Sequence, residues 1–300
     1  MTLTARSYLY VPGDRPTMLA KATACGADAL VVDLEDAVAP SAKDAARLEV
    51  SRWLDDLPTD GSAPQVWVRV NPAGPDGAPP SDDLAVAVHP AVAGVVQAKC
   101  EAPEALIRLD QELSRAEQRA GLTPRSIGVV PLIESPAAVL AMAGLAAGPR
   151  VRRLQAGEAD LSAALGMEPG PDGAELAALR WTLVLTSAAS GLDPPVGPVE
   201  TRLRDLSALR LSTEALRRQG FGGRGALHPA QVPVINEVFT PSPAEVERAT
   251  AIVESFDAAI AAGSGVAVDH EGSLIDAAVV RQALRVLGRT GTPRNGARER

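Results

Sequence analysis

The chain has 300 residues, of which 46% are hydrophobic, so it can bury the core of one large domain or two moderate ones. Its 37 acidic residues outnumber its 29 basic ones, and the net charge of -8 argues against nucleic acid or an anionic membrane as the main binding partner. It has two cysteines, no apolar leader at its start and no stretch approaching the ~20 apolar residues of a membrane span, so we expect a reduced, cytoplasmic protein.

Short apolar runs alternate with longer segments of helical periodicity, which is the pattern of repeated strand–helix units. Eight strands are expected, at residues 8–11, 29–34, 66–71, 94–99, 127–133, 153–157, 195–199 and 225–227. The main helices are expected at 16–25, 42–57, 102–120 and 174–190, each closed by a glycine or a proline. Eight units in about 240 residues predict an α/β protein built as one (β/α)8 TIM barrel, a fold of ~250 residues.

A doubly wound parallel sheet is the alternative topology, but Pro12-Gly13-Asp14 after the first strand is not the glycine-rich turn of such sheets. After residue 240 the pattern changes to two helices, 244–262 and 274–288, separated by a Gly/Ser segment. We therefore predict a catalytic barrel domain at 1–240 and a C-terminal helical extension or lid at 241–300. The tail after about residue 289 has no apolar periodicity and is expected to be disordered.

Charged residues follow six of the eight expected strands, at the end of the barrel where this fold carries active sites. They are Asp33, Glu35 and Asp36 after the second strand, Arg69 at the end of the third, Lys99 and Glu101 after the fourth, Glu134 after the fifth, Glu158 and Asp160 after the sixth, and His228 after the eighth. A single Asp in such a place can simply cap a helix. Convergence from six strands favours one shared polar site.

Carboxylates dominate this set and no cluster of His and Cys accompanies them, which favours a hard cation bound by oxygen ligands. Magnesium fits best, with Glu134 and Asp160 as the candidate pair. The chain has no GxSxG elbow and no Cys/His pair, so covalent acyl transfer is disfavoured. Lys99 beside Glu101 is interpreted as a paired charge, with a Schiff-base lysine as the lesser alternative.

Several segments, taken in their order and spacing, resemble those of one known family. They are RSYLYVPGDRP at 6–16, KATACGADALVVDLEDAVAPSAKDAAR at 21–47, VRVN at 68–71, PLIES at 131–135, GEADL at 157–161, GFGGRGALHPAQVPVINEVFTPS at 220–242 and EGSLID at 271–276. On these segments the chain resembles the HpcH/HpaI aldolases and citrate lyase β-subunits, in the branch that includes citramalyl-CoA and malyl-CoA lyases. The resemblance covers nearly the whole chain.

The resemblance implies roles for individual residues. Magnesium would be held by Glu134 and Asp160, and Arg69 would lie near the thioester oxygen of the substrate. The acyl-CoA path would be lined by Tyr10, Lys21 and the backbone of Leu227 and His228, and a surrounding shell would be formed by Glu35 and Asp36, which order waters around the metal, together with Lys99. An alternative for Arg69 is a buried ion pair with Glu35 or Asp36.

The resemblance also implies that Asp276, in the extension, is a general acid/base that reaches the active site of a neighbouring subunit in a homotrimer or hexamer. The alternative is that Asp276 caps a helix at 277–287. The chain departs from the family pattern at Ala98, where a proline is usual, at Ala138, where a glycine is usual, and at Ala277-Ala278 in place of a proline. These departures leave the substrate in question more than the type of reaction.

The predicted function is a Mg²⁺-dependent carbon–carbon lyase that cleaves or forms a CoA-linked or carrier-linked 3-hydroxyacyl thioester through a thioester enolate. Citramalyl-, malyl-, citryl- and hydroxymethylglutaryl-CoA are the candidate substrates. The alternatives are a malyl-CoA type thioesterase on the same scaffold and a non-catalytic assembly subunit, and the sequence does not separate the lyase from the thioesterase.

Overall fold

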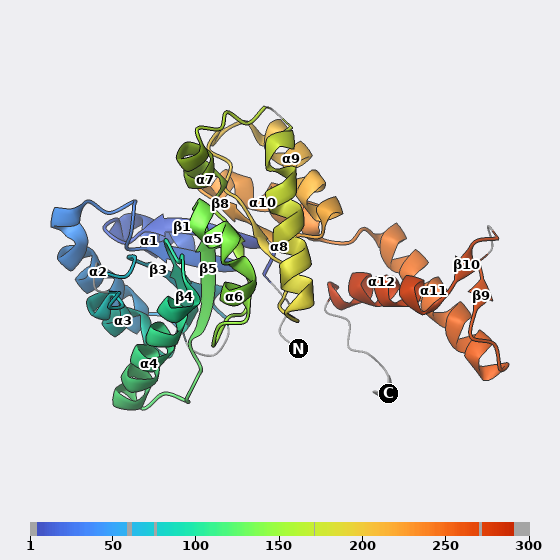
Figure 1. Cartoon of the computed structure of the whole chain (residues 1–300), viewed down its shortest axis with the longest axis horizontal. Coiled ribbons are helices and arrows are strands. Elements are labelled where there is room, and N and C mark those ends of the chain that lie inside the picture. The colour runs from blue at the N-terminus through green and yellow to red at the C-terminus, as the bar shows by residue number, and fades with distance from the viewer. Residues whose placement is uncertain (1–4, 59–61, 75–76, 171, 270–271, 291–300) are drawn as a thin grey trace. The chain divides into compact units, whose positions relative to one another are not determined.

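The computed structural model describes residues 5–58, 62–74, 77–170, 172–269 and 272–290. The described chain forms two compact units, one spanning Ala5–Phe239 and one that begins at Thr240. The first unit is an eight-stranded barrel with helices between the strands (Figure 1). None of the helices in these ranges is both long enough and apolar enough to cross a membrane.

All eight barrel strands are parallel to their neighbours, and β8 pairs with β1 to close the ring. The strands are β1 (Ser7–Pro12), β2 (Ala29–Asp33), β3 (Gln65–Val70), β4 (Val92–Gln97), β5 (Gly128–Ile133), β6 (Gln155–Ala156), β7 (Val196–Gly197) and β8 (Gly223–Ala226). The closed ring confirms the predicted TIM barrel and shows that the doubly wound alternative was wrong. Strand β7 is shorter than predicted because the flanking Pro195 and Pro198 have no N–H to donate to a ladder.

Helices connect the strands and cover the outside of the barrel. They are α1 (Pro16–Ala22), η1 (Pro40–Ala42), α2 (Lys43–Asp55), α3 (Ser81–Ala87), α4 (Pro103–Ala120), α5 (Pro136–Leu140), α6 (Met142–Ala146), α7 (Glu158–Leu165), η2 (Ala174–Leu176), α8 (Ala177–Ala189), α9 (Leu206–Gln219), η3 (Pro229–Gln231) and α10 (Val232–Phe239). The end of α4 shows why a glycine in the sequence predicts the end of a helix: Gly121 takes the left-handed conformation, at φ 67°, that caps a helix.

Alternation along the strands builds two apolar layers. In β2, Ala29 and Val31 point into the barrel and pack with Trp67, whereas Leu30 and Val32 face the surrounding helices. All of these side chains are buried, as expected for a parallel sheet covered on both sides. The apolar interior fills the lower part of the barrel and leaves the carboxyl ends of the strands for polar groups.

The second unit contains the long helix α11 (Pro243–Ala261), a small antiparallel pair β9 (Ala267–Val268) and β10 (Leu274–Ile275), and α12 (Ala277–Gly288). The predicted helix at 274–288 begins later than expected, at Ala277, because Leu274 and Ile275 pair with β9 and Asp276 caps α12. Helices α11 and α12 pack against each other. Residues 291–300, most of the tail for which disorder was predicted, lie outside the described residues.

Candidate active site

A cavity of about 170 Å³ opens at the carboxyl ends of the barrel strands. Its lining comes from Tyr10, Arg69, Leu132, Glu134, Gln155, Ala156, Gly157, Glu158, Ala159, Asp160, Pro198, Val199 and Leu227. The structure thus brings together five of the residues singled out from the sequence: Tyr10, Arg69, Glu134, Asp160 and Leu227. They come from the loops and ends of β1, β3, β5, β6 and β8.

Arg69 is fixed by two carboxylates from the end of β2. Its Nε donates to Asp33 Oδ1 at 2.7 Å, its Nη2 donates to Asp33 Oδ2 at 2.5 Å, and its Nη1 lies 3.1 Å from Glu35 Oε2. Burial opposes the charge on Arg69, but the hydrogen bonds and charge of Asp33 outweigh it and raise the pKa of the guanidinium. Arg69 therefore stays charged in one fixed orientation. The alternative interpretation expected an ion pair with Glu35 or Asp36; the structure has the pair with Glu35, and the second partner is Asp33.

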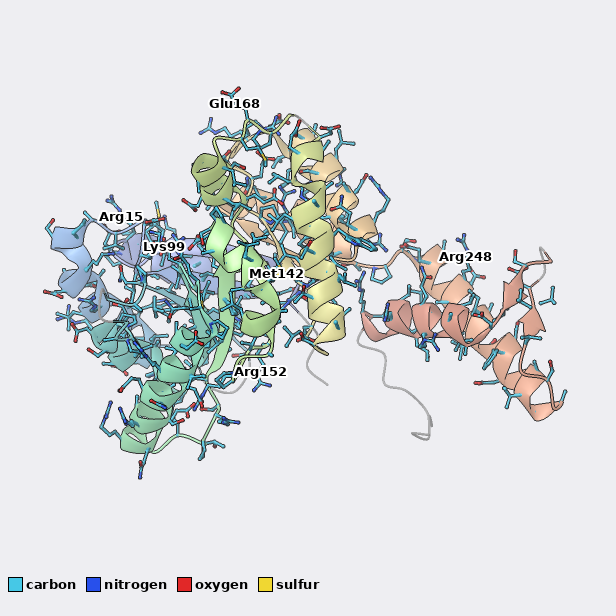
Figure 2. All side chains as sticks on the ribbon, in the orientation of Figure 1. Arg15, Lys99, Met142, Arg152, Glu168 and Arg248 are labelled. Atoms are coloured by element: carbon cyan, nitrogen blue, oxygen red, sulfur yellow. The ribbon has the colours of Figure 1, made fainter. Side chains whose placement is uncertain are left out.

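Lys99, which is labelled in Figure 2, links two of the site's carboxylates. Its Nζ donates to Glu35 Oε1 at 2.7 Å, and its backbone N–H donates to Glu134 Oε1 at 2.6 Å. The residue has a φ of 48°, the left-handed region that non-glycine residues seldom occupy. The hydrogen bond with Glu35 raises the pKa of Lys99, which supports the paired charge over a Schiff-base lysine, because the latter needs a neutral amine.

Glu134 is the most perturbed carboxylate of the cavity. Burial, followed by the charges of Asp160 and Glu35, raises its pKa to about 7 despite the hydrogen bond from the Lys99 backbone. The close approach of Gly157 leaves no room for a side chain: a Cβ there would lie 2.4 Å from Glu134 Cβ and 3.2 Å from Glu134 Oε2. The backbone at Gly157 therefore helps to hold Glu134 in place.

This arrangement fits a divalent cation that takes few protein ligands. Glu134 and Asp160 line the same cavity, and the charge of Asp160 adds to burial in raising the pKa of Glu134; a bound cation would offset that repulsion. Within the described ranges there is no group of three or more His, Cys, Asp or Glu side chains able to hold a metal. Magnesium fits such a site, since it is commonly bound by one or two carboxylates with water and substrate in its other positions.

Tyr10 and Gln155 form the floor of the cavity. Gln155 Nε2 donates to Tyr10 Oη at 2.8 Å, and the guanidinium carbon of Arg69 lies 5.3 Å from the centroid of the Tyr10 ring. Burial raises the pKa of Tyr10 and outweighs the opposing effect of Arg69. The Tyr10 hydroxyl is therefore a neutral hydrogen-bonding group rather than a base.

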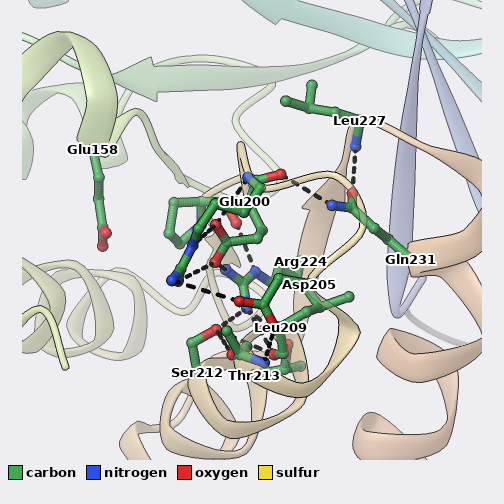
Figure 3. Close-up of polar contacts among 12 residues, drawn as sticks. Glu158, Glu200, Asp205, Leu209, Ser212, Thr213, Arg224, Leu227 and Gln231 are labelled. Carbon is green, nitrogen blue, oxygen red and sulfur yellow. Dashed lines mark hydrogen bonds and ion pairs between the residues drawn. The ribbon is translucent and has the colours of Figure 1, made fainter. Parts of the chain in front are cut away.

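Leu227 enters the cavity on a loop that is fixed from below (Figure 3). Gln231 Oε1 accepts hydrogen bonds from the backbone N–H groups of Leu227, at 2.8 Å, and His228, at 3.3 Å. The Gln231 amide in turn donates to the carbonyl oxygen of Glu200 at 3.0 Å. Arg224, whose pKa is lowered to about 10 chiefly by burial, donates to Ser212, at 2.7 Å, and braces the same region.

Lys21, Asp36 and His228, which were also singled out from the sequence, lie outside the cavity lining, as do Glu35 and Lys99 described above. Lys21 is exposed on α1, and Asp36 is exposed with its Oδ1 3.7 Å from Lys99 Nζ. His228 precedes η3 and caps it, accepting a hydrogen bond from the Ala230 N–H at 3.1 Å. No hydrogen bond or ion pair joins Lys21, Asp36 or His228 to Arg69 or Glu134 in the part of the chain that the structure describes.

Asp276 lies in the C-terminal unit, at the N-cap of α12. Its Oδ1 accepts hydrogen bonds from Ala278, at 2.8 Å, and Val279, at 3.0 Å. These two backbone hydrogen bonds lower the pKa of Asp276. The capping role is thus present, and both of these bonds are accepted by Oδ1 alone.

The sequence alone did not single out several residues of this site. Asp33 was noted only as part of a charged run, although as the last residue of β2 it lies inside the barrel beside Arg69. Gln155 is a polar residue within an apolar strand run, and that was the signal available for it. Glu158 was noted only among the charged strand ends; it lines the cavity and is held by Arg180 from α8, through two hydrogen bonds of 2.7 Å.

Comparisons with known proteins identify the family of this chain. The sequence pattern of the HpcH/HpaI aldolase/citrate lyase family matches residues 6–229. Citrate lyase subunit beta of Escherichia coli K12 is 29% identical over 294 residues, covering 96% of this chain and 94% of that protein. The (3S)-malyl-CoA thioesterase of Cereibacter sphaeroides is 34% identical over 271 residues, covering 90% of this chain and 89% of the relative.

Two solved structures of proteins from Mycobacterium tuberculosis have a fold similar to that of this chain. A crystal structure of CitE from Mycobacterium tuberculosis in complex with magnesium, acetoacetate and coenzyme A superimposes with a TM-score of 0.77 at 26% identity, covering 97% of this chain and 99% of that one. The citrate lyase beta subunit from the same organism, complexed with oxaloacetate and magnesium, gives a TM-score of 0.65 at 28% identity over 79% of this chain and 98% of that one.

Proposed function

This chain belongs to the HpcH/HpaI aldolase/citrate lyase family, and from that premise we propose that it is a Mg²⁺-dependent carbon–carbon lyase acting on a 3-hydroxyacyl-CoA thioester. One observation carries the proposal: Glu134, Asp160 and a fixed, charged Arg69 line a single cavity at the carboxyl ends of the strands. Magnesium and coenzyme A in the related CitE structure support both the cofactor and the class of substrate.

Glu134 and Asp160 would hold the magnesium ion, which when bound supplies a Lewis acid for the hydroxyl and carboxylate oxygens of the substrate. The chain fixes Glu134 through Oε1, which accepts from the backbone N–H of Lys99, and through the close backbone of Gly157. Oε2 of Glu134 would then be the oxygen offered to the cation. Asp160 is exposed on the first turn of α7 and can adjust to the bound substrate.

Arg69 would stabilise the negative charge that develops on the thioester oxygen when the carbon–carbon bond breaks. A guanidinium has five N–H donors; the two bonds to Asp33 use Nε and one donor of Nη2, and Nη1 faces Glu35, so two donors remain for a ligand. Because Asp33 and Glu35 hold the group before substrate arrives, little reorganisation is needed during the reaction. Removal of one such donor typically costs ~10² to 10³ in rate.

Asp276 would exchange the proton with the enolate carbon. Its lowered pKa makes it a carboxylate at neutral pH, which is the form that abstracts the α-proton in the condensation direction. We propose that it does so at the site of a neighbouring subunit in a cytoplasmic homotrimer or hexamer. Lys21 and the backbone of Leu227 and His228 would contact the CoA portion.

A thioesterase is the second candidate. The malyl-CoA thioesterases are 34% identical to this chain, compared with 29% for the citrate lyase beta subunit of Escherichia coli. Both activities use the same class of substrate and differ in whether the thioester is hydrolysed. A non-catalytic assembly subunit is disfavoured because the candidate metal and anion-binding residues converge on one cavity.

The test is to incubate the purified protein and Mg²⁺ with malyl-, citramalyl-, citryl- and hydroxymethylglutaryl-CoA and to measure the released keto acid and free CoA thiol separately. Keto acid or acetoacetate without free thiol identifies the lyase. Free thiol without carbon–carbon cleavage identifies the thioesterase, and neither product with any of the four substrates would refute an enzymatic role on them.

A further inference from the structure

The floor of the cavity lies deeper in the barrel than the two carboxylates. Gln155 pairs in register with Leu132, two residues before Glu134 on β5, so its side chain lies one layer below that of Glu134. The residue is 2% exposed and still lines the cavity. A buried glutamine at this position presents an amide to whatever enters the barrel.

The Gln155 amide is only half satisfied within the described residues. Its Nε2 donates to Tyr10 Oη at 2.8 Å, whereas its Oε1 has no hydrogen-bond partner there. A buried carbonyl oxygen without a partner is costly, and buried polar groups in native proteins almost always have one. Because this oxygen belongs to a cavity-lining residue, a ligand that donates a hydrogen bond would satisfy it.

Tyr10 adds the complementary group. Its hydroxyl oxygen accepts from Gln155, so the hydroxyl hydrogen is directed away from that amide. The nearby Gly225 packs closely against this pair: a Cβ there would lie 2.7 Å from Val199 Cγ1 and 3.5 Å from Tyr10 Cε2, so this position leaves no room for a side chain. The floor therefore offers one O–H donor beside one carbonyl acceptor.

This pair of groups matches one part of the proposed substrate. Carboxylate, thioester and keto oxygens only accept hydrogen bonds, whereas an alcohol hydroxyl both donates and accepts. The 3-hydroxyl is the one such group at the reacting end of a 3-hydroxyacyl thioester. We propose that Gln155 is a substrate-binding residue whose Oε1 accepts a hydrogen bond from the 3-hydroxyl, while the Tyr10 hydroxyl donates to the same oxygen.

The inference rests on the proposed function, because it assigns the hydroxyl of that substrate class to a place in the cavity. It makes Gln155 the residue that distinguishes a hydroxyacyl thioester from its deoxy analogue. A site built to bond a hydroxyl discriminates strongly against a ligand that lacks it, since its own polar groups are then left unpaired.

The experiment compares malyl-CoA with succinyl-CoA, which is malyl-CoA without its hydroxyl. For wild type, Gln155→Leu and Gln155→Met, we would measure kcat/KM for malyl-CoA and the inhibition constant of succinyl-CoA, both with Mg²⁺ present. We expect both variants to lower kcat/KM about 10-fold or more, while the inhibition constant of succinyl-CoA changes less than about 2-fold. The Met variant retains side-chain length, so a packing defect of the Leu variant is recognised.

The matched control is Gln65→Leu, at the opposite end of the barrel, which should leave both constants unchanged. An equal loss for both thioesters, or no loss for malyl-CoA, would overturn the assignment. If wild type cleaves none of the hydroxyacyl thioesters, the proposed function fails. The assignment of Gln155 is then decided by the dissociation constants of malyl-CoA and succinyl-CoA. It is refuted if wild type does not bind malyl-CoA more tightly than succinyl-CoA, or if Gln155→Leu still binds malyl-CoA more tightly to the same degree.

Discussion

Gly157→Ala should disable the site through a single methyl group. The added Cβ would lie 2.4 Å from Glu134 Cβ and 3.2 Å from its Cα, distances that require one of the two strands to move. The backbone of Gly157, at φ -106° and ψ 67°, is accessible to alanine, so the effect comes from packing rather than from backbone strain. Overpacking of this kind typically costs ~1 to 3 kcal/mol of stability.

The functional effect should exceed the loss of stability. Glu134 is held on one side by the Lys99 N–H, and a shift of its backbone moves the oxygen that would face the metal. A displacement of ~1 Å in a catalytic group can cost ~10² in rate. We therefore expect a folded variant with a denaturation midpoint lowered in line with ~1 to 3 kcal/mol and a lyase rate reduced about 100-fold.

The assay combines chemical denaturation, lyase kinetics and titration with Mn²⁺ followed by electron paramagnetic resonance. Gly170→Ala is the control, since a Cβ there meets nothing closer than 3.5 Å, and it should leave all three readouts unchanged. Wild-type activity and unchanged Mn²⁺ affinity in Gly157→Ala would refute the idea that the Gly157 backbone fixes Glu134.

Three further predictions concern other parts of the chain. Arg69→Lys should lose ~10² to 10³ in kcat, because the planar fork that pairs with Asp33 is lost; a rate within a few-fold of wild type would assign Arg69 a structural role only. Asp276→Asn keeps an equally good helix cap, so the variant should retain its fold and CoA-ester binding but lose turnover. Mixing it with Glu134→Ala should restore some activity through hybrid oligomers, whereas near-normal turnover of Asp276→Asn alone would leave only the capping role. Burial alone would raise the pKa of Glu117, but hydrogen bonds from Arg150 and two backbone N–H groups lower it, so the Glu117 carboxylate stabilises the fold above its ordinary pKa of 4.5 and loses that contribution as the pH falls through its lowered pKa. Because Arg150 keeps its ion pair with Asp110, Glu117→Gln should be ~1 to 3 kcal/mol less stable at pH 7 and its stability should depend less on acid pH; equal acid sensitivity would contradict the assignment.

Periodicity was enough to predict the barrel, and strand-end chemistry named four of the residues that line the cavity: Arg69, Glu134, Glu158 and Asp160. Glu134 and Asp160 could be found because a TIM barrel brings the carboxyl ends of its strands together, whatever their separation in sequence. The partner of Arg69 could not be chosen in the same way. Asp33, Glu35 and Asp36 are neighbours in sequence, and only the inward or outward direction of each side chain decides which one meets the guanidinium.

Other features depend on tertiary contacts that leave little trace in a single sequence. The left-handed backbone of Lys99 shows only in the folded chain, where it directs the N–H to Glu134 and the ammonium to Glu35. Gln155 appeared as one polar residue in an apolar run, and its half-satisfied amide becomes visible only beside Tyr10. The short strand pair before α12 was missed because each strand has only two residues.

The most direct test of the central claim is the rate of keto-acid release from a hydroxyacyl-CoA substrate after the protein has been stripped with a chelator and titrated with Mg²⁺. The account predicts no release without the cation, saturable recovery when Mg²⁺ is added, and no recovery at any Mg²⁺ concentration in Glu134→Gln or Asp160→Asn. Full activity of the stripped wild-type protein in excess chelator, or normal recovery in both variants, would contradict it.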